Sequence, residues 1–286
     1  MTLVDLCSGT SALSLWALAR LRPLTGYMGS KRSDAAQLCT VLDCRDPDEV
    51  VLVDGGPWGD VWATMRDGAL RARVVAYLRT WGTLGDLPTV WPTLLTPPSA
   101  DPAHRAAQYL CLQSRAANCI PVWWSEAAGR WESPSGSRMS TESAHQKGTG
   151  ACDLKNRAKM GTSRGLVHIA SLADRVESLS RIDWGRVTVH HGDVREVSPI
   201  PGATVYMDPP YQGAPRYACL FPRADVLDVA WRWARVADLV VVSEAEPLAL
   251  PGWHFAPLRA SGKPEWLTMS RPCPAVCGLQ LAMEMP

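Results

Sequence analysis

The chain has 286 residues, enough for one α/β domain with a sizeable insertion or for two small domains. Its 29 basic and 28 acidic residues leave a formal net charge of +1, which excludes a histone-like or tail-driven binder of polyanions. Nine cysteines in a chain too large to depend on a disulfide framework predict buried thiols in a reducing cytoplasm.

The N-terminus lacks a basic region followed by an apolar run and a cleavage site, and no uncharged stretch of about 20 residues occurs elsewhere. We therefore expect an unprocessed cytoplasmic protein that does not enter a membrane. Cys273 and Cys277 have a spacing that metal ligands can use, but no second pair lies near them. We expect these two cysteines to be buried thiols and predict no metal site.

Strand–turn–helix units open the chain. In such a unit an apolar strand ends on glycine or small polar residues and the chain continues with helical spacing. The first third contains two of these units, with a further helix between them. In chain order, the predicted elements are a strand at 3–7, a helix at 12–21, a helix ending near 42, a strand at 50–53 and a helix that contains 62 and 65.

The middle of the chain is predicted to be helical and then irregular. A helix is expected over 66–81, and the glycines and prolines between 82 and 98 then predict a long loop. The segment 104–117 has the pattern of an amphipathic helix. From 123 to 164 the chain is rich in Gly, Ser, Arg and Lys and poor in aliphatic residues, which indicates an exposed excursion.

Strands and helices alternate again after the excursion. The predicted elements are a helix at 167–180, strands at 187–190 and 204–207, a helix at 225–235, a strand at 239–242, and short apolar segments at 253–258, 266–269 and 276–283. The last three suit antiparallel strands at a sheet edge. The alternation predicts an α/β fold with a doubly wound, mainly parallel, Rossmann-like sheet.

Polar residues follow four of the predicted strands. In doubly wound sheets, ligands bind beyond the carboxyl ends of the strands, where glycines permit close approach of the backbone. Each motif alone also fits a helix cap or a solvated loop. The four strand ends are Asp5 with Ser8-Gly9-Thr10-Ser11, Asp54-Gly55-Gly56, Gly192-Asp193, and Asp208-Pro209-Pro210-Tyr211.

The Asp-Pro-Pro-Tyr motif suits chemistry at an amino group that is conjugated to a base ring. Such a nitrogen is a poor nucleophile because its lone pair is delocalised, so an enzyme must hold its hydrogens with acceptors. Asp208 offers a carboxylate oxygen, and the carbonyl of Pro209 offers a second acceptor in a turn that Pro209 and Pro210 make rigid. Tyr211 offers a ring on which a base can stack. We predict that these four residues are catalytic.

With these motifs the chain resembles the DNA adenine-N6 methyltransferases of the Dam type. The resemblance covers most of the chain outside the loops. It implies binding of S-adenosylmethionine by Asp5, Cys7, Ser8, Gly9, Thr10, Ser11, Tyr27, Met28, Gly29, Ser30, Lys31, Asp54, Asp193, Val194 and Asp208. Within this set, Val4–Ser11 is similar to the motif for the methionine part, Asp54 to the acid for the ribose, and Asp193 to the acid near the adenine. Tyr217 lies where the family often has another aromatic residue.

The chain departs from the family pattern in three ways. The Gly-Lys segment, 26–32, follows the first strand and helix, whereas in the family it opens the chain. Ser11 and Ser30 stand where the family usually has glycine. No segment corresponds to the hairpin that reads the target sequence, so the sequence leaves specificity open.

The resemblance implies methyl transfer to adenine N6 of a base that is flipped out of double-stranded DNA. It implies an S-adenosylmethionine-binding catalytic domain formed by 1–82 and 166–286, with 83–165 as an inserted DNA-recognition region. Because the sulfonium already activates the methyl group, no metal is needed. We expect a monomer or weak dimer in a bacterial or phage-infected cell, in a restriction–modification system, a phage or a solitary methylase.

The excursion is the predicted DNA contact. Between 130 and 164 there are seven basic residues and three acidic ones. A solvated loop is the alternative interpretation, and the nearby Trp123, Trp124 and Trp131 fit either base stacking or a small satellite core. The residues predicted to contact nucleic acid are Tyr211, Tyr217, Arg130, Arg138, Lys147, Lys155, Arg157 and Lys159.

Other functions remain open at this point. A cytosine-N4 methyltransferase would use the same acceptors, although such enzymes more often have Ser at the position of Asp208. A nucleotide or small-molecule methyltransferase would have an enclosed site and no basic excursion. A DNA-binding protein derived from a methyltransferase would have lost the acid or the tyrosine of the catalytic motif, and both are present.

Overall fold

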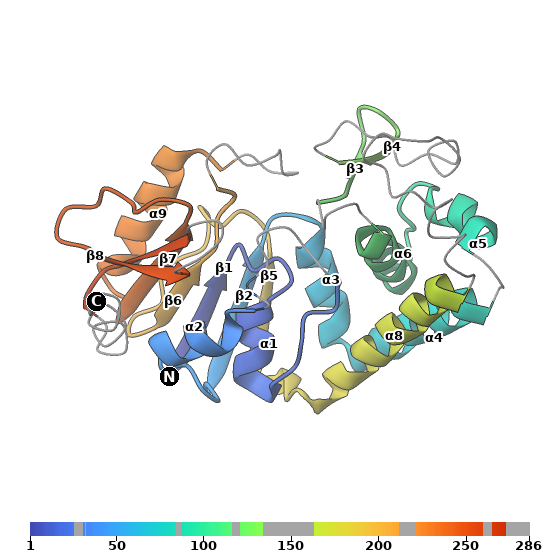
Figure 1. Cartoon of the computed structure of the whole chain (residues 1–286), viewed down its shortest axis with the longest axis horizontal. Coiled ribbons are helices and arrows are strands. Elements are labelled where there is room, and N and C mark those ends of the chain that lie inside the picture. Colours follow the sequence, from blue (N-terminus) through green and yellow to red (C-terminus); the bar gives the residue numbers. More distant parts are fainter. Residues whose placement is uncertain are drawn as a thin grey trace, which may run out of the picture.

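The computed structural model describes residues 1–25, 31, 33–83, 87–115, 121–133, 163–211, 221–259 and 265–272. Within these ranges the chain forms a seven-stranded sheet of order β5-β2-β1-β6-β7-β9-β8, flanked by helices (Figure 1). The strands are β1 (Thr2–Leu6), β2 (Glu49–Asp54), β5 (Val187–His191), β6 (Thr204–Met207), β7 (Leu239–Glu244), β8 (His254–Arg259) and β9 (Glu265–Met269).

The first five strands of this sheet are parallel, as predicted. Parallel strands are covered by helices on both faces, and so their sequences are continuous apolar runs rather than alternating ones. The runs Val50–Val53 and Val240–Val242 are buried accordingly. The doubly wound α/β fold predicted from the sequence is confirmed.

Alternate residues of the strands enter two separate hydrophobic cores. Leu3 and Val50 belong to the core beneath α1 (Ala12–Ala19), α2 (Ala35–Val41) and α3 (Pro57–Arg66). Val4 and Val51 belong to the opposite core, which α9 (Arg223–Ala234) covers. This period of two is the pleat of the strands. It places Asp5 on the same face of the sheet as Leu3 and α1.

The far edge of the sheet is antiparallel. β9 pairs antiparallel with both β7 and β8. It lies between them in the sheet although it follows both in the chain. This confirms the prediction that the segments at 253–258 and 266–269 are antiparallel strands at the edge. The third predicted segment, 276–283, lies outside the described residues.

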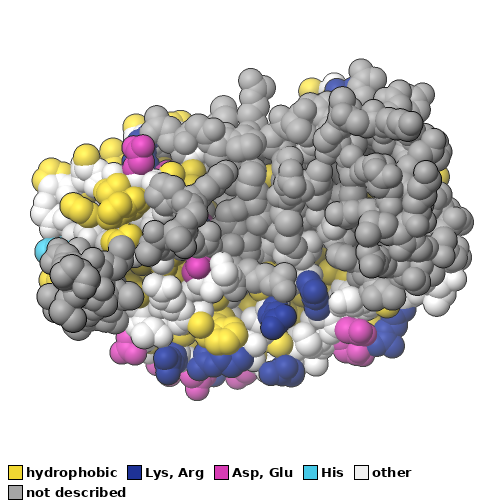
Figure 2. Space-filling view, viewed as in Figure 1, with side chains coloured by type: hydrophobic (Ala, Val, Ile, Leu, Met, Phe, Trp, Pro, Cys, Tyr) yellow, Lys and Arg dark blue, Asp and Glu magenta, His cyan; other side chains and the backbone are white. Residues whose placement is uncertain are grey.

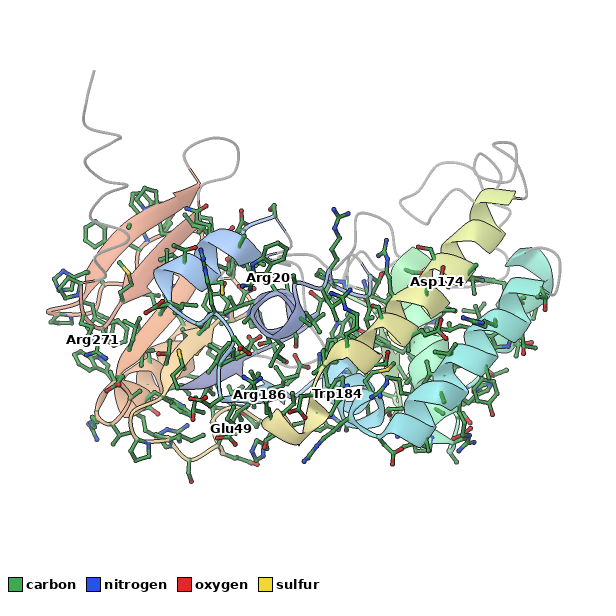
Figure 3. The ribbon with its side chains drawn as sticks, turned by 90° about the horizontal axis from the view of Figure 1, so that it is seen from below. Arg20, Glu49, Asp174, Trp184, Arg186 and Arg271 are labelled. Atoms are coloured by element: carbon green, nitrogen blue, oxygen red, sulfur yellow. The ribbon has the colours of Figure 1, made fainter. Side chains whose placement is uncertain are left out.

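Helices form a second body beside the sheet (Figure 1). They are α4 (Gly68–Thr83), α5 (Leu87–Leu94), α6 (Pro102–Arg115) and α8 (Ser163–Ser178). α4 packs against α8 and against α6, and Figures 1 and 3 show α4 and α8 side by side. α4 and α8 lie at the two borders of the predicted insertion. The division into a catalytic domain, 1–82 with 166–286, and an inserted region, 83–165, stays a prediction.

A short connection joins α8 to the sheet. Trp184 and Arg186, labelled in Figure 3, belong to a 3-10 turn at Trp184–Arg186 that leads directly into β5. The guanidinium carbon of Arg71 in α4 lies 5.5 Å from the centre of the Trp184 ring. The connection therefore contacts the helical body and the sheet together.

Part of the segment 82–98, predicted to be a loop, is helical in the described residues. The expected loop at 82–98 contains α5, in spite of Pro92 inside the helix, because Val90, Trp91 and Leu94 bury their side chains against the neighbouring helices. Burial of these apolar groups outweighs the hydrogen bond that Pro92 removes. No helix in the described ranges is both long enough and apolar enough to cross a membrane.

The start of the predicted excursion is a hairpin, β3 (Trp123–Ser125) paired with β4 (Arg130–Glu132). Trp131 is buried and donates from its ring nitrogen to the carbonyl of Thr96 at 3.0 Å. Trp124 packs against Trp131 edge to face. These two rings belong to the core, as the satellite-core interpretation predicted. The stretch 134–162 lies outside the described residues.

Candidate functional site

The polar strand ends meet at one edge of the sheet. The N–H of Ser8 donates to the carbonyl of Val53 at 2.9 Å, which joins the end of β1 to the end of β2. Asp208 N–H donates to Leu6 O at 3.2 Å, and Gly192 N–H donates to Asp54 O at 3.2 Å. Because the carboxyl ends of parallel strands share an edge, these bonds bring all four predicted motifs together.

The turn after β1 has an unusual backbone. Cys7, Gly9 and Ser11 all have positive φ, at 58°, 46° and 48°. Glycine adopts this conformation without steric cost, whereas another residue costs roughly 1 kcal/mol. Glycine at the position of Ser11 would therefore adopt this turn without steric cost. Trp62 Nε1 donates to the carbonyl of Gly9 at 2.7 Å and fixes the turn from α3.

Asp54 connects the turns after β1 and β2. Its Oδ2 accepts from the N–H of Gly9 at 2.8 Å, and its Oδ1 accepts from the N–H of Gly56 at 2.8 Å. Burial raises the pKa of Asp54, and these two bonds, which favour the charged carboxylate, oppose the rise. A side chain at Gly59 would collide with the carbonyl of Asp54 and the ring of His191, each 2.5 Å from its Cβ. Glycine at this position lets α3 begin close to the site.

Asp5 is the most deeply buried carboxyl group of the site. It is 2% exposed, and Ser14 Oγ donates to its Oδ2 at 2.6 Å. Burial raises the pKa of Asp5 to about 8, and the hydrogen bond from Ser14 lowers it only in part. Asp208 and Asp54 raise it further by like-charge repulsion, which shows that the three carboxyl groups are close neighbours.

This pKa gives a stability prediction. The folded pKa lies above the ordinary 3.8, so the stabilising contribution of protonated Asp5 is complete below about pH 4 and is lost as pH rises towards 8. Between pH 5 and pH 8 the free energy of unfolding should fall by an amount on the order of 3 kcal/mol from this group. We expect Asp5→Asn to flatten this dependence. Denaturant unfolding of both proteins across the range tests it, and parallel curves would contradict the buried protonated state.

Acidic groups surround the turn after β1. Burial raises the pKa of the Cys7 thiol well above its usual range, and the carboxylates of Asp54, Asp208, Asp5 and Asp193 raise it further, in that order. Four carboxyl groups, one from each strand end, therefore act on a single side chain. A ligand that carries positive charge would be stabilised at this edge.

Asp193 is held by a neighbour that the sequence prediction did not include. The guanidinium of Arg195 contacts both carboxylate oxygens of Asp193 and also pairs with Asp225 at 2.5 Å. The hydrogen bonds from Arg195 lower the pKa of Asp193. Asp193 is thus a fixed carboxylate at this edge, and the adjacent Val194 is buried in the sheet core.

Asp208 is bound on one oxygen. Its Oδ1 accepts from the ammonium of Lys31 at 2.6 Å and from Ser243 Oγ at 2.9 Å. Among the residues that the structure describes, none bonds to Oδ2. Burial raises the pKa of Asp208 and Lys31 opposes that rise, while the side chain is 19% exposed. The carboxylate is therefore fixed in orientation and keeps one oxygen for a further donor.

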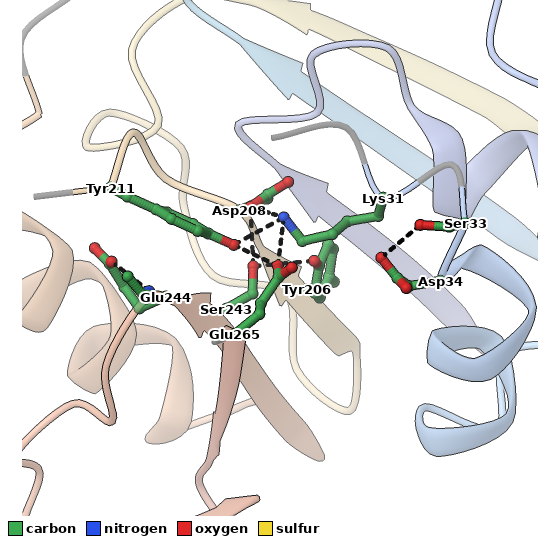
Figure 4. A network of polar contacts seen from close by, with 10 residues as sticks. Lys31, Ser33, Asp34, Tyr206, Asp208, Tyr211, Ser243, Glu244 and Glu265 are labelled. Carbon is green, nitrogen blue, oxygen red and sulfur yellow. Dashed lines mark hydrogen bonds and ion pairs between the residues drawn. The ribbon is translucent and has the colours of Figure 1, made fainter. Parts of the chain in front are cut away.

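Lys31 is the centre of a buried polar cluster (Figure 4). Its side chain is 3% exposed, and its Nζ lies 2.9 Å from Glu265 Oε1 and 2.9 Å from the hydroxyl of Tyr211. The Tyr211 hydroxyl in turn donates to Glu265 Oε1 at 2.5 Å. Tyr206 OH and Ser243 Oγ lie 3.0 Å apart and extend the cluster into the sheet.

Sequence reasoning missed three members of this cluster: Tyr206, Ser243 and Glu265. Tyr206 stands inside a run that reads as an ordinary buried strand, and Ser243 directly follows such a run. Glu265 precedes an apolar strand and has no motif around it. A polar residue at the end of β7, beside the Asp-Pro-Pro-Tyr strand, is the one signal that could have pointed to Ser243.

The described site includes Asp5, Cys7, Ser8, Gly9, Thr10, Ser11, Lys31, Asp54, Asp193, Val194 and Asp208–Tyr211 from the prediction. Arg130 is also described; it forms an exposed ion pair with Glu132 at 3.0 Å in the hairpin. The other predicted residues lie outside the described ranges: Tyr27, Met28, Gly29, Ser30, Tyr217, Arg138, Lys147, Lys155, Arg157 and Lys159.

The described surface does not itself identify a polyanion-binding face. In Figure 2, basic and acidic side chains of the coloured residues alternate along the lower edge. The described part of the chain also holds no group of three or more His, Cys, Asp or Glu residues arranged to bind a metal. Cys273 and Cys277 lie outside the described residues.

Comparison with known proteins adds little to this geometry. No protein-family model and no curated protein matches the chain significantly. Among solved structures, the rRNA methyltransferase aviRa from Streptomyces viridochromogenes matches at 14% sequence identity with a TM-score of 0.32, over 98% of this chain and 78% of that chain. A TM-score this low supports no conclusion about function, and the site stands on its own contacts.

Proposed function

We propose that this protein is an S-adenosylmethionine-dependent DNA methyltransferase that acts on adenine N6 of a flipped-out base. One observation carries the proposal: Asp208 is fixed through Oδ1 by Lys31 and Ser243, and its Oδ2 has no partner among the described residues. The carboxylate stands at the edge of the sheet where doubly wound folds bind ligands. It is the acceptor that a conjugated amino group requires.

The residues at this edge fit the cofactor. S-adenosylmethionine, when bound, supplies an electrophilic methyl group on a positively charged sulfur, and it also carries an ammonium group and ribose hydroxyls. The carboxylates of Asp54, Asp193 and Asp208 give the edge the opposite charge. The turn of positive-φ residues after β1 exposes backbone at the same place. We assign the turn 8–11, Asp54 and Asp193 to holding the cofactor.

The Asp-Pro-Pro-Tyr turn would hold the target. Oδ2 of Asp208 would accept one hydrogen of the amino group, and the carbonyl of Pro209 the other. This concentrates the lone pair on the nitrogen and stabilises the positive charge that develops there. The Tyr211 ring, held at its hydroxyl, would stack on the base and offset part of the few kcal/mol that flipping costs. Positioning is the main contribution of the protein.

Transfer to DNA is tested by identifying the product. Purified protein, unmethylated genomic DNA and methyl-labelled S-adenosylmethionine are incubated with a chelator, and the DNA is digested to nucleosides. We expect label in N6-methyl-2′-deoxyadenosine and no requirement for a divalent metal. Label in N4-methyl-2′-deoxycytidine would identify cytosine as the target in place of adenine, because the same two acceptors suit that amino group. Absence of label in DNA would contradict the proposed substrate.

The basic segment of the excursion should provide contacts to phosphate. Neutralising Lys155, Arg157 and Lys159 together is expected to weaken binding to all DNA sequences. The slope of log K against log salt should flatten by up to about 0.9 for each contact that is lost. Cofactor affinity should not change. Filter-binding titrations at several salt concentrations measure both the affinity and the slope.

The matched control neutralises Arg66, Arg235 and Arg271, three exposed basic residues on described parts of the chain. It removes the same net charge from the protein, so it separates local contacts from a general electrostatic effect. If both triple variants gave the wild-type slope, the segment would be a solvated loop and DNA would bind elsewhere.

A further inference from the structure

Glu265 lies at the proposed catalytic edge because of the direction of β9. The parallel strands reach this edge at their carboxyl ends, whereas β9 runs antiparallel and reaches it with its first residue. The pairing of Glu244 with Trp266 places the start of β9 beside the end of β7. A glutamate far from the Asp-Pro-Pro-Tyr motif in sequence thereby contacts both Lys31 and Tyr211.

The cluster has more carboxylates than cations. One ammonium, Lys31, lies between two carboxylates, Asp208 at 2.6 Å and Glu265 at 2.9 Å. The Glu265 side chain is 8% exposed, and burial of a carboxylate is costly unless it is paired and hydrogen-bonded. Glu265 is paired with the ammonium of Lys31 and accepts a hydrogen bond from Tyr211, so both conditions are met.

We propose that Glu265 is a positioning residue for the methyl transfer, on the basis of the function proposed above. It holds the Lys31 ammonium on the Oδ1 side of Asp208 and fixes the Tyr211 ring through its hydroxyl. The free oxygen of Asp208 then stays available to the target amino group, and the stacking surface keeps one orientation. Glu265 touches neither the base nor the reacting atoms in this arrangement.

The physical reason lies in the geometry of the ammonium. Lys31 has three donors, and its present acceptors include both carboxylates and the Tyr211 hydroxyl. Without the charge of Glu265, the attraction between Lys31 and Asp208 is unbalanced, and the ammonium is drawn across the carboxylate towards Oδ2. The Tyr211 hydroxyl at the same time loses the acceptor that fixes its ring.

Two variants separate these contributions. Glu265→Gln retains an oxygen that can accept from Tyr211 but removes the charge that balances Lys31, while Glu265→Ala removes both. With DNA as substrate we expect kcat to fall by about 10- to 100-fold in Glu265→Gln, and further in Glu265→Ala. Cofactor affinity should stay within about 2-fold in both, because no contact of Glu265 reaches Asp54 or the turn after β1 among those described.

A readout without cofactor or DNA tests the contact itself. 3-Fluorotyrosine at position 211 gives a 19F signal that reports the surroundings and mobility of this ring. Burial, and then the carboxylates of Asp208 and Glu265, hold the pKa of Tyr211 well above its ordinary value, so the phenol stays protonated and the signal reports its contacts with Glu265 and Lys31. We expect the 19F chemical shift to change in Glu265→Gln, and the signal to lose its single environment in Glu265→Ala.

Glu244→Gln is the matched control. Glu244 is also a buried glutamate at this edge, and its ion pair is with Arg223 at 2.9 Å instead of Lys31. The 19F chemical shift of position 211 in Glu244→Gln should match that of the wild type. Thermal unfolding of each variant establishes that it is folded, and a Tyr211→Phe, Glu265→Ala double variant should lose less activity than the product of the single losses.

The outcomes separate the two proposals. If the wild type is active and Glu265→Gln has an unchanged kcat, or if the 19F chemical shift does not change in Glu265→Gln, the role of Glu265 is overturned and the methyltransferase proposal stays intact. Wild type that transfers no methyl group to DNA would overturn the proposed function. Multiplicative losses in the double variant would also count against Glu265, since two residues that act together are not independent.

Discussion

Replacing Asp208 with alanine is expected to lower the rate of methyl transfer by about 10³-fold, because the variant loses the acceptor for the target amino group. Cofactor affinity should change by no more than about 2-fold to 3-fold, since the bonds of Asp208 run to Lys31 and Ser243 and not to the turn after β1. Single-turnover kinetics with saturating cofactor give the rate, and calorimetry gives the affinity.

Two further variants make this result specific. Asp208→Asn keeps the shape of the side chain but not its charge, and should lose nearly as much activity. Ser243→Ala removes one of the two bonds to Oδ1 and should lose about 10-fold or less, since Lys31 still fixes that oxygen. If Asp208→Ala instead abolished cofactor binding and Ser243→Ala were equally severe, Asp208 would belong to the cofactor site.

Asp54→Ala should chiefly lower cofactor affinity and have a smaller effect on the rate of methyl transfer. The carboxylate accepts from Gly9 and Gly56 and is the predicted partner of the ribose hydroxyls, so its loss removes a ligand contact and loosens two turns. We expect affinity for S-adenosylmethionine to fall by about 10- to 100-fold, as for the loss of one hydrogen bond to a charged group. The rate of transfer at saturating cofactor should fall much less. Calorimetric titration measures the affinity.

Asp60→Ala is the comparison for Asp54→Ala. Asp60 lies in α3 near the same edge, but its partners are His191 at the end of β5, at 3.2 Å, and Arg105 in α6, at 3.4 Å. This variant should bind the cofactor with nearly wild-type affinity. Equal weakening in the two variants would show that the loss reflects general disturbance near α3 and not a contact made by Asp54.

The candidate site was predictable where a motif is continuous in the sequence. Asp54, Asp193 and Asp208 lie at or just after the ends of strands and Asp5 lies one residue before such an end, and parallel strands place their ends at one edge. The cluster around Lys31 was only half predictable. Lys31 and Tyr211 stand in motifs, whereas Glu265 reaches them only because β9 is inserted antiparallel between β7 and β8. Strand order is a tertiary property, and a lone acid before an apolar strand does not reveal it.

The packing of the helical body could also not be predicted from local sequence patterns. Gly82 to Pro98 reads as a loop because prolines remove hydrogen bonds, but α5 forms where Trp91 and Leu94 can be buried. The sequence around Trp131 fits both base stacking and core packing, and in the structure its ring is buried in the core. The local preference of a segment for loop or helix is weaker than the free energy gained by burying large apolar side chains. The conformation of α5 and the position of Trp131 therefore depend on neighbours that are distant in the chain.

Periodicity, apolar runs and turn residues act locally, so the doubly wound sheet and the polar residues at its strand ends could be predicted from the sequence. Three features required the folded structure: which oxygen of Asp208 is left open, the link that Asp54 makes between two turns, and the place of Glu265 in the cluster. These features depend on contacts between residues far apart in the chain; Lys31 and Asp208, for example, are separated by 177 residues. Such contacts arise only when strand order and direction bring the segments to one edge.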